Sequence, residues 1–162
     1  MANFDHISAL CADQDDVVYV SHFSDEANPH ELSTKNATKS GLLRAVLESD
    51  NTVQNRRDKP IIIKHGTREA FDFVLQYFDF YKDRDEAPIP PKPLPKYKPI
   101  EEIFAAELPL FRTLFQKETV ERFELLQELA MLANNLDMQI LLEKICAIIA
   151  YYFLQNKQEG SK

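Results

Sequence analysis

Two predicted helices meet in residues 129–146, which read LAMLANNLDMQILLEKIC. Apolar residues recur at helical spacing through the first of them: Val120, Phe123, Leu126, Leu129, Ala130 and Ala133. This spacing predicts an amphipathic helix that ends at Asn134 and Asn135, because asparagine is common where helices stop. We expect Asp137 to cap the second helix. That helix is apolar on nearly all sides, so it should be a core helix or one face of an interface.

The first half of the chain predicts a small sheet. Val17–Val20 is a β-branched and aromatic run, and a turn separates it from a second short strand at His30–Leu32. Ile61–Ile63 is a continuous β-branched run, which predicts a third strand buried on both faces. Between the second and third strands, Gly41–Leu47 carries apolar residues on one helical face and predicts a short helix.

An aromatic helix should follow the third strand, with Thr67 as its N-cap. It carries two apolar stripes, so we expect it to lie between two neighbours. The stripes contain Phe71, Val74, Leu75 and Phe78 on one side and Phe73, Tyr77 and Phe80 on the other. A short helix is predicted at Ile100–Phe104, and Pro109 should interrupt the chain before the amphipathic helix. The order of elements predicts a segregated α+β domain.

Residues 87–99 contain six prolines, which exclude a helix and predict an extended polyproline conformation. The segment also satisfies a bare PxxP pattern at Pro90–Pro93, which suits ligands of aromatic-lined grooves. That pattern is common by chance. A passive connector between two helices is therefore the favoured interpretation.

Composition excludes several classes of function. The net charge of −7 lacks the positive field that phosphate backbones require, so nucleic acid is not an expected partner. The three glycines cannot build a phosphate-cradling loop or a nucleophile elbow, which need several glycines close together. No apolar run is long enough and free enough of charge to predict insertion into a membrane. We therefore expect neither an enzyme nor a bound cofactor, and instead a protein that binds other proteins.

The cysteines and histidines give no strong sign of a metal or catalytic site. Cys11 and Cys146 suit a reducing compartment, and Cys146 should be a small buried group in the apolar helix. His22 and His30 flank the predicted turn and could meet Cys11 around a metal. Nothing in the sequence sets the spacing of such a site. Surface histidines are the favoured interpretation, and no metal is expected.

Residues 129–146 closely resemble the family of S-phase-kinase-associated protein and elongin C. In that family an alanine-rich helix ends in Ala-Asn-aromatic-Leu-Asp, and in the kinase-associated branch a Leu-Leu pair and then a cysteine follow. Other pieces occur in the same order along this chain. They are Ser40–Leu47, Pro60–Ile63, Tyr77–Lys82, the proline-rich segment and Leu108–Phe111. The resemblance implies a BTB/POZ-like fold, with a small three-stranded sheet flanked by about five or six helices.

The resemblance also implies a function: a non-catalytic adaptor that links a cullin to a substrate receptor in a ubiquitin ligase, and so takes part in ubiquitin-dependent protein breakdown. Asn134 and Asn135 occupy the positions of the family's asparagine–aromatic pair, which contributes to the cullin contact. A helix stop is the competing interpretation of this pair. The apolar surface of the last helix would hold the receptor, through Ile140, Leu141, Ile145, Ile148, Ile149, Tyr152 and Phe153.

The resemblance covers an adaptor domain at residues 15–153, with flexible ends expected at 1–14 and 154–162. Only a few polar residues follow Phe153 here, so the further helices that hold an F-box in the kinase-associated branch are not expected. The alternative is a BTB/POZ-like structural subunit of a larger assembly that binds neither cullin nor F-box. For both functions we expect a cytoplasmic or nuclear protein.

Overall fold

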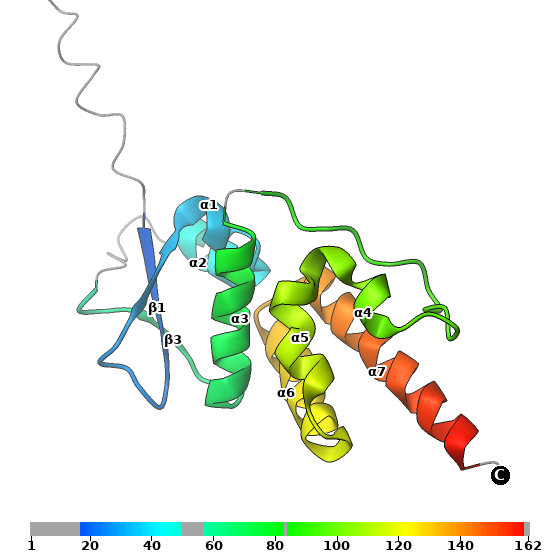
Figure 1. The fold of residues 1–162 in the computed structure, drawn as a ribbon. Helices are drawn as coiled ribbons and strands as arrows, with labels where there is room; N and C mark the ends of the chain where they lie inside the picture. Colours follow the sequence, from blue (N-terminus) through cyan, green and yellow to red (C-terminus); the bar gives the residue numbers. More distant parts are fainter. Residues whose placement is uncertain (1–16, 50–56, 83, 161–162) are drawn as a thin grey trace, which may run out of the picture.

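A three-stranded sheet lies at one end of a group of helices in the computed structural model, which describes residues 17–49, 57–82 and 84–160 (Figure 1). The described elements are β1 (Val17–His22), β2 (His30–Ser33), α1 (Thr34–Ala37), α2 (Gly41–Ser49), β3 (Ile61–Ile63), α3 (Arg68–Phe80), α4 (Ile100–Ile103), a 3-10 turn η2 (Ala105–Glu107), α5 (Leu108–Gln116), α6 (Thr119–Asn135) and α7 (Gln139–Glu159). The predicted α+β class is confirmed.

The sheet has the strand order β2-β1-β3. β1 and β2 form the predicted antiparallel hairpin, in which Val20 lies opposite His30. β3 runs parallel to β1, with Ile61 beside Val20. The prediction that β3 is buried on both faces is wrong, because β3 is an edge strand. Its Ile63 is buried, whereas Ile61 and Ile62 are only partly covered.

The helix α3 lies between the sheet and the α5–α6 pair, as its two apolar stripes predicted (Figure 1). Thr67 is its N-cap, and the hydroxyl of Thr67 accepts a hydrogen bond of 3.2 Å from the backbone N–H of Ala70. Its side chains fill the middle of the core, including the buried residues Phe71, Phe73, Val74, Tyr77 and Phe78. These aromatic rings join the core of the sheet to that of the helices.

Pro109 begins a helix rather than only interrupting the chain, which corrects the sequence-based prediction. It lies in the first turn of α5, where the missing N–H of proline has no partner to lose. The helix α6 ends at Asn135 as predicted. Its Val120 is 69% exposed, although the periodicity placed it on the apolar face. The core face instead contains Leu125 and Leu132 beside the expected leucines.

The turn between α6 and α7 differs from the prediction that Asp137 caps α7. Asp137 has a φ of 51° and lies in the left-handed region, and Met138 occupies the N-cap without a side-chain hydrogen bond. The helix α7 then continues through Glu159. Most of the segment 154–162 that we expected to be flexible is thus helical, and residues 1–14 lie outside the described residues. Within the described ranges, no helix has both the length and the apolar composition needed to cross a membrane.

The prediction that Cys146 is buried is wrong, because α7 turns another face to the core. Cys146 is exposed, whereas Lys144 is fully buried. The Nζ of Lys144 lies 2.9 Å from Oε2 of Glu107, which is itself almost completely buried in η2. Because neighbouring residues on a helix are about 100° apart, the side that directs Lys144 inward directs Cys146 outward.

His22 is buried, so the prediction of a surface histidine is wrong at this position. Its Nε2 lies 2.9 Å from the backbone oxygen of Gly66, and its Nδ1 lies 2.6 Å from the hydroxyl of Ser24. His30 is partly buried, with its ring edge against Phe71. Cys11 lies outside the described residues. In the described part of the chain, no group of three His, Cys, Asp or Glu side chains could hold a metal ion.

Candidate protein-docking grooves

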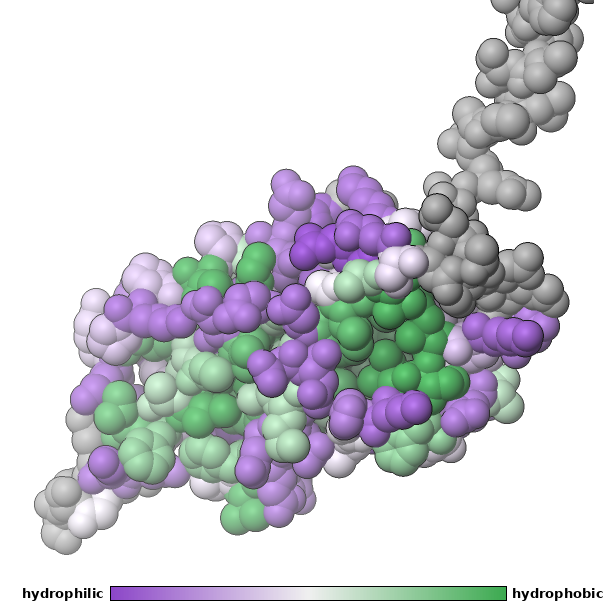
Figure 2. Space-filling view, turned by 180° about the vertical axis from the view of Figure 1, so that it is seen from behind, coloured by the Kyte–Doolittle hydropathy of each residue, from purple (hydrophilic) through white to green (hydrophobic). Residues whose placement is uncertain are grey.

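An apolar groove of about 270 Å³ runs between α2 and the edge strand β3, and we call it the α2–β3 groove. Its lining consists of Leu42, Val46, Ile61, Ile62, Ile63, Lys64, His65, Asn135 and Leu136. From behind, the molecule shows apolar side chains gathered over the half that carries the sheet (Figure 2). Leu42 is 40% exposed on one wall, so apolar surface is open to solvent there.

The wall that α2 provides is held in place by the α6–α7 turn. The backbone N–H groups of Gly41 and Leu42 donate to the carbonyl oxygens of Asp137 and Leu136, at 2.9 and 3.2 Å. The hydroxyl of Ser40 donates to the same Leu136 oxygen at 2.6 Å and accepts from the N–H of Leu43 at 3.2 Å. The start of α2 is therefore satisfied by the turn that follows α6.

The two residues predicted to contact a cullin lie at the end of α6, and both are exposed. Asn135 forms part of the lining of the α2–β3 groove, whereas Asn134 does not. The carbonyl oxygen of Asn134 accepts a hydrogen bond of 3.1 Å from the N–H of Asp137, which closes the helix end. Both predicted interpretations of the pair, helix stop and contact, are compatible with this geometry, and the contact stays a prediction.

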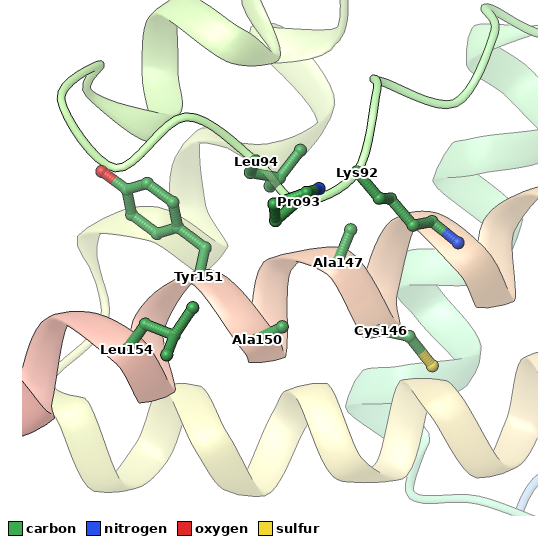
Figure 3. A pocket seen from close by; sticks show the side chains of 8 residues that line it. All are labelled: Lys92, Pro93, Leu94, Cys146, Ala147, Ala150, Tyr151 and Leu154. Carbon is green, nitrogen blue, oxygen red and sulfur yellow. The ribbon is translucent and has the colours of Figure 1, made fainter.

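A second groove, of about 430 Å³, lies between the proline-rich segment and α7, and we call it the proline-loop groove (Figure 3). Its lining consists of Lys92, Pro93, Leu94, Cys146, Ala147, Ala150, Tyr151 and Leu154. Figure 3 shows the loop passing along α7, with the ring of Tyr151 reaching up to it. Ala147 and Ala150 have small side chains, which leaves space between the loop and the helix.

The proline-rich segment contains no helix, as predicted, but it is extended only in part, because it bends at Lys92 and Pro93 and turns at Lys96 and Tyr97. It is also attached to α7 and is not a passive connector. The Nζ of Lys92 lies 2.7 Å from Oε2 of Glu143. The hydroxyl of Tyr151 donates to the carbonyl oxygen of Lys98 at 2.9 Å, and the amide of Gln155 donates to that of Lys96 at 3.2 Å. Leu94 is buried against the core. The contacts join residues more than fifty positions apart, so local sequence cannot reveal them.

The residues predicted to form a receptor-type face do not share one surface. Leu141, Ile145 and Ile148 are fully buried in the core of this chain. Ile149 and Tyr152 are partly buried against that core, and only Ile140 and Phe153 are exposed. The buried positions repeat at helical spacing and form the stripe that packs on α6. Sequence reasoning missed the small residues of the proline-loop groove, although their spacing on α7 was a visible signal.

Packing shifts the ionisation of tyrosine side chains in and just after α3 and on α7. Burial raises the pKa of Tyr77 and Tyr81 well above the usual range. The hydrogen bond to Glu86 adds to this effect at Tyr77, and the negative charge of Glu107 adds to it at Tyr81. Burial also raises the pKa of Tyr152 to about 12, although the guanidinium of Arg122 lies over its ring at 4.2 Å from the centroid. On the surface, the hydrogen bond from Lys92 lowers the pKa of Glu143.

These features describe a folded chain with two apolar grooves, each bordered by a few polar groups. Such grooves suit the side chains of another protein segment, because apolar walls give affinity and a few polar groups set orientation. Comparison of the chain with models of known protein families finds no match, and comparison with curated proteins finds none.

Proposed function

We propose that this protein is a non-catalytic adaptor of the Skp/elongin C type, which links a cullin to a substrate receptor within a ubiquitin ligase. The proposed adaptor would act in the cytoplasm, the nucleus or both. Its main support is the α2–β3 groove, an open apolar surface whose wall includes Asn135. The resemblance in residues 129–146 assigns that position to a cullin contact. The α+β fold with a hairpin and a parallel third strand is compatible with a BTB/POZ-like domain.

The receptor would bind on the side of α7 that faces away from the core. Phe153 is 54% exposed there, and the proline-loop groove opens along the same helix. Exposed aromatic side chains are frequent anchors in protein interfaces. In this proposal the receptor contact involves α7, but through residues other than the buried Leu141, Ile145 and Ile148.

One observation favours the alternative, a structural subunit of a larger assembly that binds neither cullin nor F-box. Much of the apolar face that would hold a receptor is already buried within this chain. A chain that covers this face by itself has less surface left for a receptor helix. The alternative predicts one stable complex without ligase components.

Affinity purification of the full chain with mass spectrometry distinguishes the two functions. The test variant is Leu42→Asp, which places a charge in the α2–β3 groove. Leu42 lies near the N-terminus of α2, where a negative charge is tolerated by the helix dipole, so the fold should be retained. The matched control is Val120→Asp, at an exposed apolar position on α6 that lies about 22 Å along the helix from Asn135 in the groove wall.

The adaptor proposal expects a cullin and a RING protein with the parent chain and with Val120→Asp, and loss of both with Leu42→Asp. Circular dichroism should show that both variants are folded. If the parent chain repeatedly recovers one stable complex with no cullin, the adaptor proposal fails and the structural subunit is supported.

A further inference from the structure

The charged groups around the α2–β3 groove indicate what kind of segment it accepts. We propose that the groove binds an apolar protein segment that carries carboxylates, with an acidic side chain placed against Lys64 and His65. This inference rests on the proposed function, because it specifies the chemistry of the partner at the same groove. It would make the groove selective for acidic partners over basic ones.

The first argument is the composition of the lining. Lys64 and His65 are the titratable residues in it, and no Asp or Glu lines the described groove. The side-chain amide of Asn135 adds an NH₂ donor as well as an acceptor oxygen. The chain as a whole has a net charge of −7, so a site without carboxylates differs from the average composition of the chain. A cationic group in a lining without carboxylates complements a carboxylate from a partner.

The second argument is that the ammonium group of Lys64 is available. Lys64 is exposed and follows directly after β3. Within the described residues it forms no ion pair, whereas Lys92, Lys117 and Lys144 each pair with a glutamate. An incoming carboxylate would therefore not have to displace an internal partner. A basic segment would place like charges side by side and be rejected.

The third argument is the apolar lining of the groove, which indicates that the partner needs apolar side chains as well as carboxylates. Ile61 and Ile62 are partly exposed on the edge strand, and Leu42 and Val46 face them from α2. Docking would remove this apolar surface from water, which supplies affinity. The charged rim then selects among apolar segments, because charges at an interface rim contribute mainly to specificity.

The test is a selection from a random twelve-residue peptide library displayed on phage, with the full chain as bait. The variants are Lys64→Glu and, as a control with the same charge change on the exposed face of α1, Lys35→Glu. The parent chain should enrich peptides that combine Leu, Ile or Phe with Asp or Glu. Their affinity should fall about five- to tenfold in Lys64→Glu, be unchanged in Lys35→Glu, and be lost in Leu42→Asp.

Selection with Lys64→Glu as bait should enrich peptides with Lys or Arg instead. The inference is overturned if no peptide is enriched, if enrichment does not depend on Leu42, or if the enriched peptides show no acidic bias. Its failure is distinguishable from failure of the proposed function. If a cullin is recovered in a Leu42-dependent way but the selected peptides show no acidic bias, the adaptor proposal is retained and the acidic partner is rejected. If the selected peptides are acidic but no cullin is recovered, the acidic partner is retained and the adaptor proposal is rejected.

Discussion

Gly41 and Asp137 touch where α2 meets the α6–α7 turn, and this contact sets one wall of the α2–β3 groove. A Cβ on residue 41 would overlap the carboxylate of Asp137 and lie 3.0 Å from its Cβ. The space at this position therefore favours glycine. Asp137 itself has a φ of 51°, which aspartate tolerates better than most residues and glycine adopts freely.

Gly41→Ala should lower the free energy of unfolding by about 1–3 kcal/mol, because the methyl group overlaps the side chain of Asp137. The better helix propensity of alanine offsets only part of this loss. Urea denaturation measures the effect. Asp137→Gly removes the side chain that the new methyl group would overlap. Gly41→Ala should therefore lower the free energy of unfolding much less in the Asp137→Gly background than in the parent chain. Equal losses in both backgrounds would contradict the steric explanation.

A second prediction at this scale concerns the buried pair of Lys144 and Glu107. Lys144→Met leaves the carboxylate of Glu107 without its cation in the core, which should lower the free energy of unfolding by about 3–5 kcal/mol. The double variant Lys144→Met/Glu107→Met removes both charges and should recover much of that loss. Chemical denaturation of the two variants tests this. A double variant less stable than the single one would show that the pair itself, and not the stranded charge, dominates.

Among the larger elements, the proline-rich segment and α7 form one unit. Leu94 is the point where the loop enters the core, and Tyr151 and Gln155 bind the loop at Lys98 and Lys96. These contacts are few and lie far apart in the chain. The loop should consequently open locally before the whole domain unfolds, since local opening needs few contacts to break.

Leu94→Ala should make the loop open more often, and limited trypsin digestion can detect this. In the segment 87–99, Lys92 and Lys98 precede prolines and resist trypsin, so cleavage should occur between Lys96 and Tyr97. We expect a rate increase of about tenfold, which corresponds to a loss of about 1.4 kcal/mol in the loop contacts.

Two further variants make the digestion specific. Tyr151→Phe removes only the hydroxyl that bonds the loop and should increase cleavage less than Leu94→Ala. Val120→Ala, at a distant exposed position, should leave the rate unchanged. If Leu94→Ala cleaves at the parental rate while remaining folded, the loop is not held by its leucine.

For the whole molecule, the tyrosines predict how stability depends on pH. Their pKa values are raised in the folded chain at Tyr77, Tyr81, Tyr151 and Tyr152. An unfolded chain loses these protons near pH 10. Their contribution to stability is therefore complete below pH 10 and is lost as the pH rises above it, because the unfolded state is then the first to ionise.

The free energy of unfolding should fall between pH 10 and pH 12, by at most about 1.4 kcal/mol per pH unit for each phenol. Tyr152→Phe should make the fall in the free energy of unfolding per pH unit less steep, by less than about 1.4 kcal/mol, because Tyr152 is only half-buried. Its pKa of about 12 sets the upper end of the pH range over which it contributes. Urea titrations at several alkaline pH values measure the slopes. A Tyr152→Phe slope equal to that of the parent would count against the burial of this phenol.

Prediction from sequence succeeded where the signal was local. The hairpin, the Thr67 cap of α3, the end of α6 at Asn135 and the lack of helix in the proline-rich segment each depend on neighbouring residues. It failed mainly where two distant segments decide the outcome. Asp137 adopts a left-handed conformation beside the start of α2, and His22 bonds Gly66, 44 positions away. Pro109 is a local failure, because proline was interpreted as an interruption and not as a residue of the first helical turn.

The candidate site likewise combines features that local sequence predicted with features that depend on distant segments. Asn135 was named from sequence and lies in the groove wall, but the other walls come from α2 and β3, which local patterns do not bring together. Lys64 and His65 carry no sequence signal of binding. The receptor-type face was assigned from a helix that is apolar on nearly all sides, and such a helix gives no indication of which side is inward.

The sequence by itself determined the three strands, most of the helices, their order and the α+β class, because hydrophobic spacing and capping residues act over a few positions. Only the tertiary structure decided which side of α7 faces the core, with Lys144 inside and Cys146 outside, and where the α2–β3 and proline-loop grooves lie. The physical reason is that the rotation of a helix apolar on nearly all sides depends on what packs against it. Glu107, far away in the chain, provides the partner that a buried Lys144 needs on the side that also buries Leu141, Ile145 and Ile148.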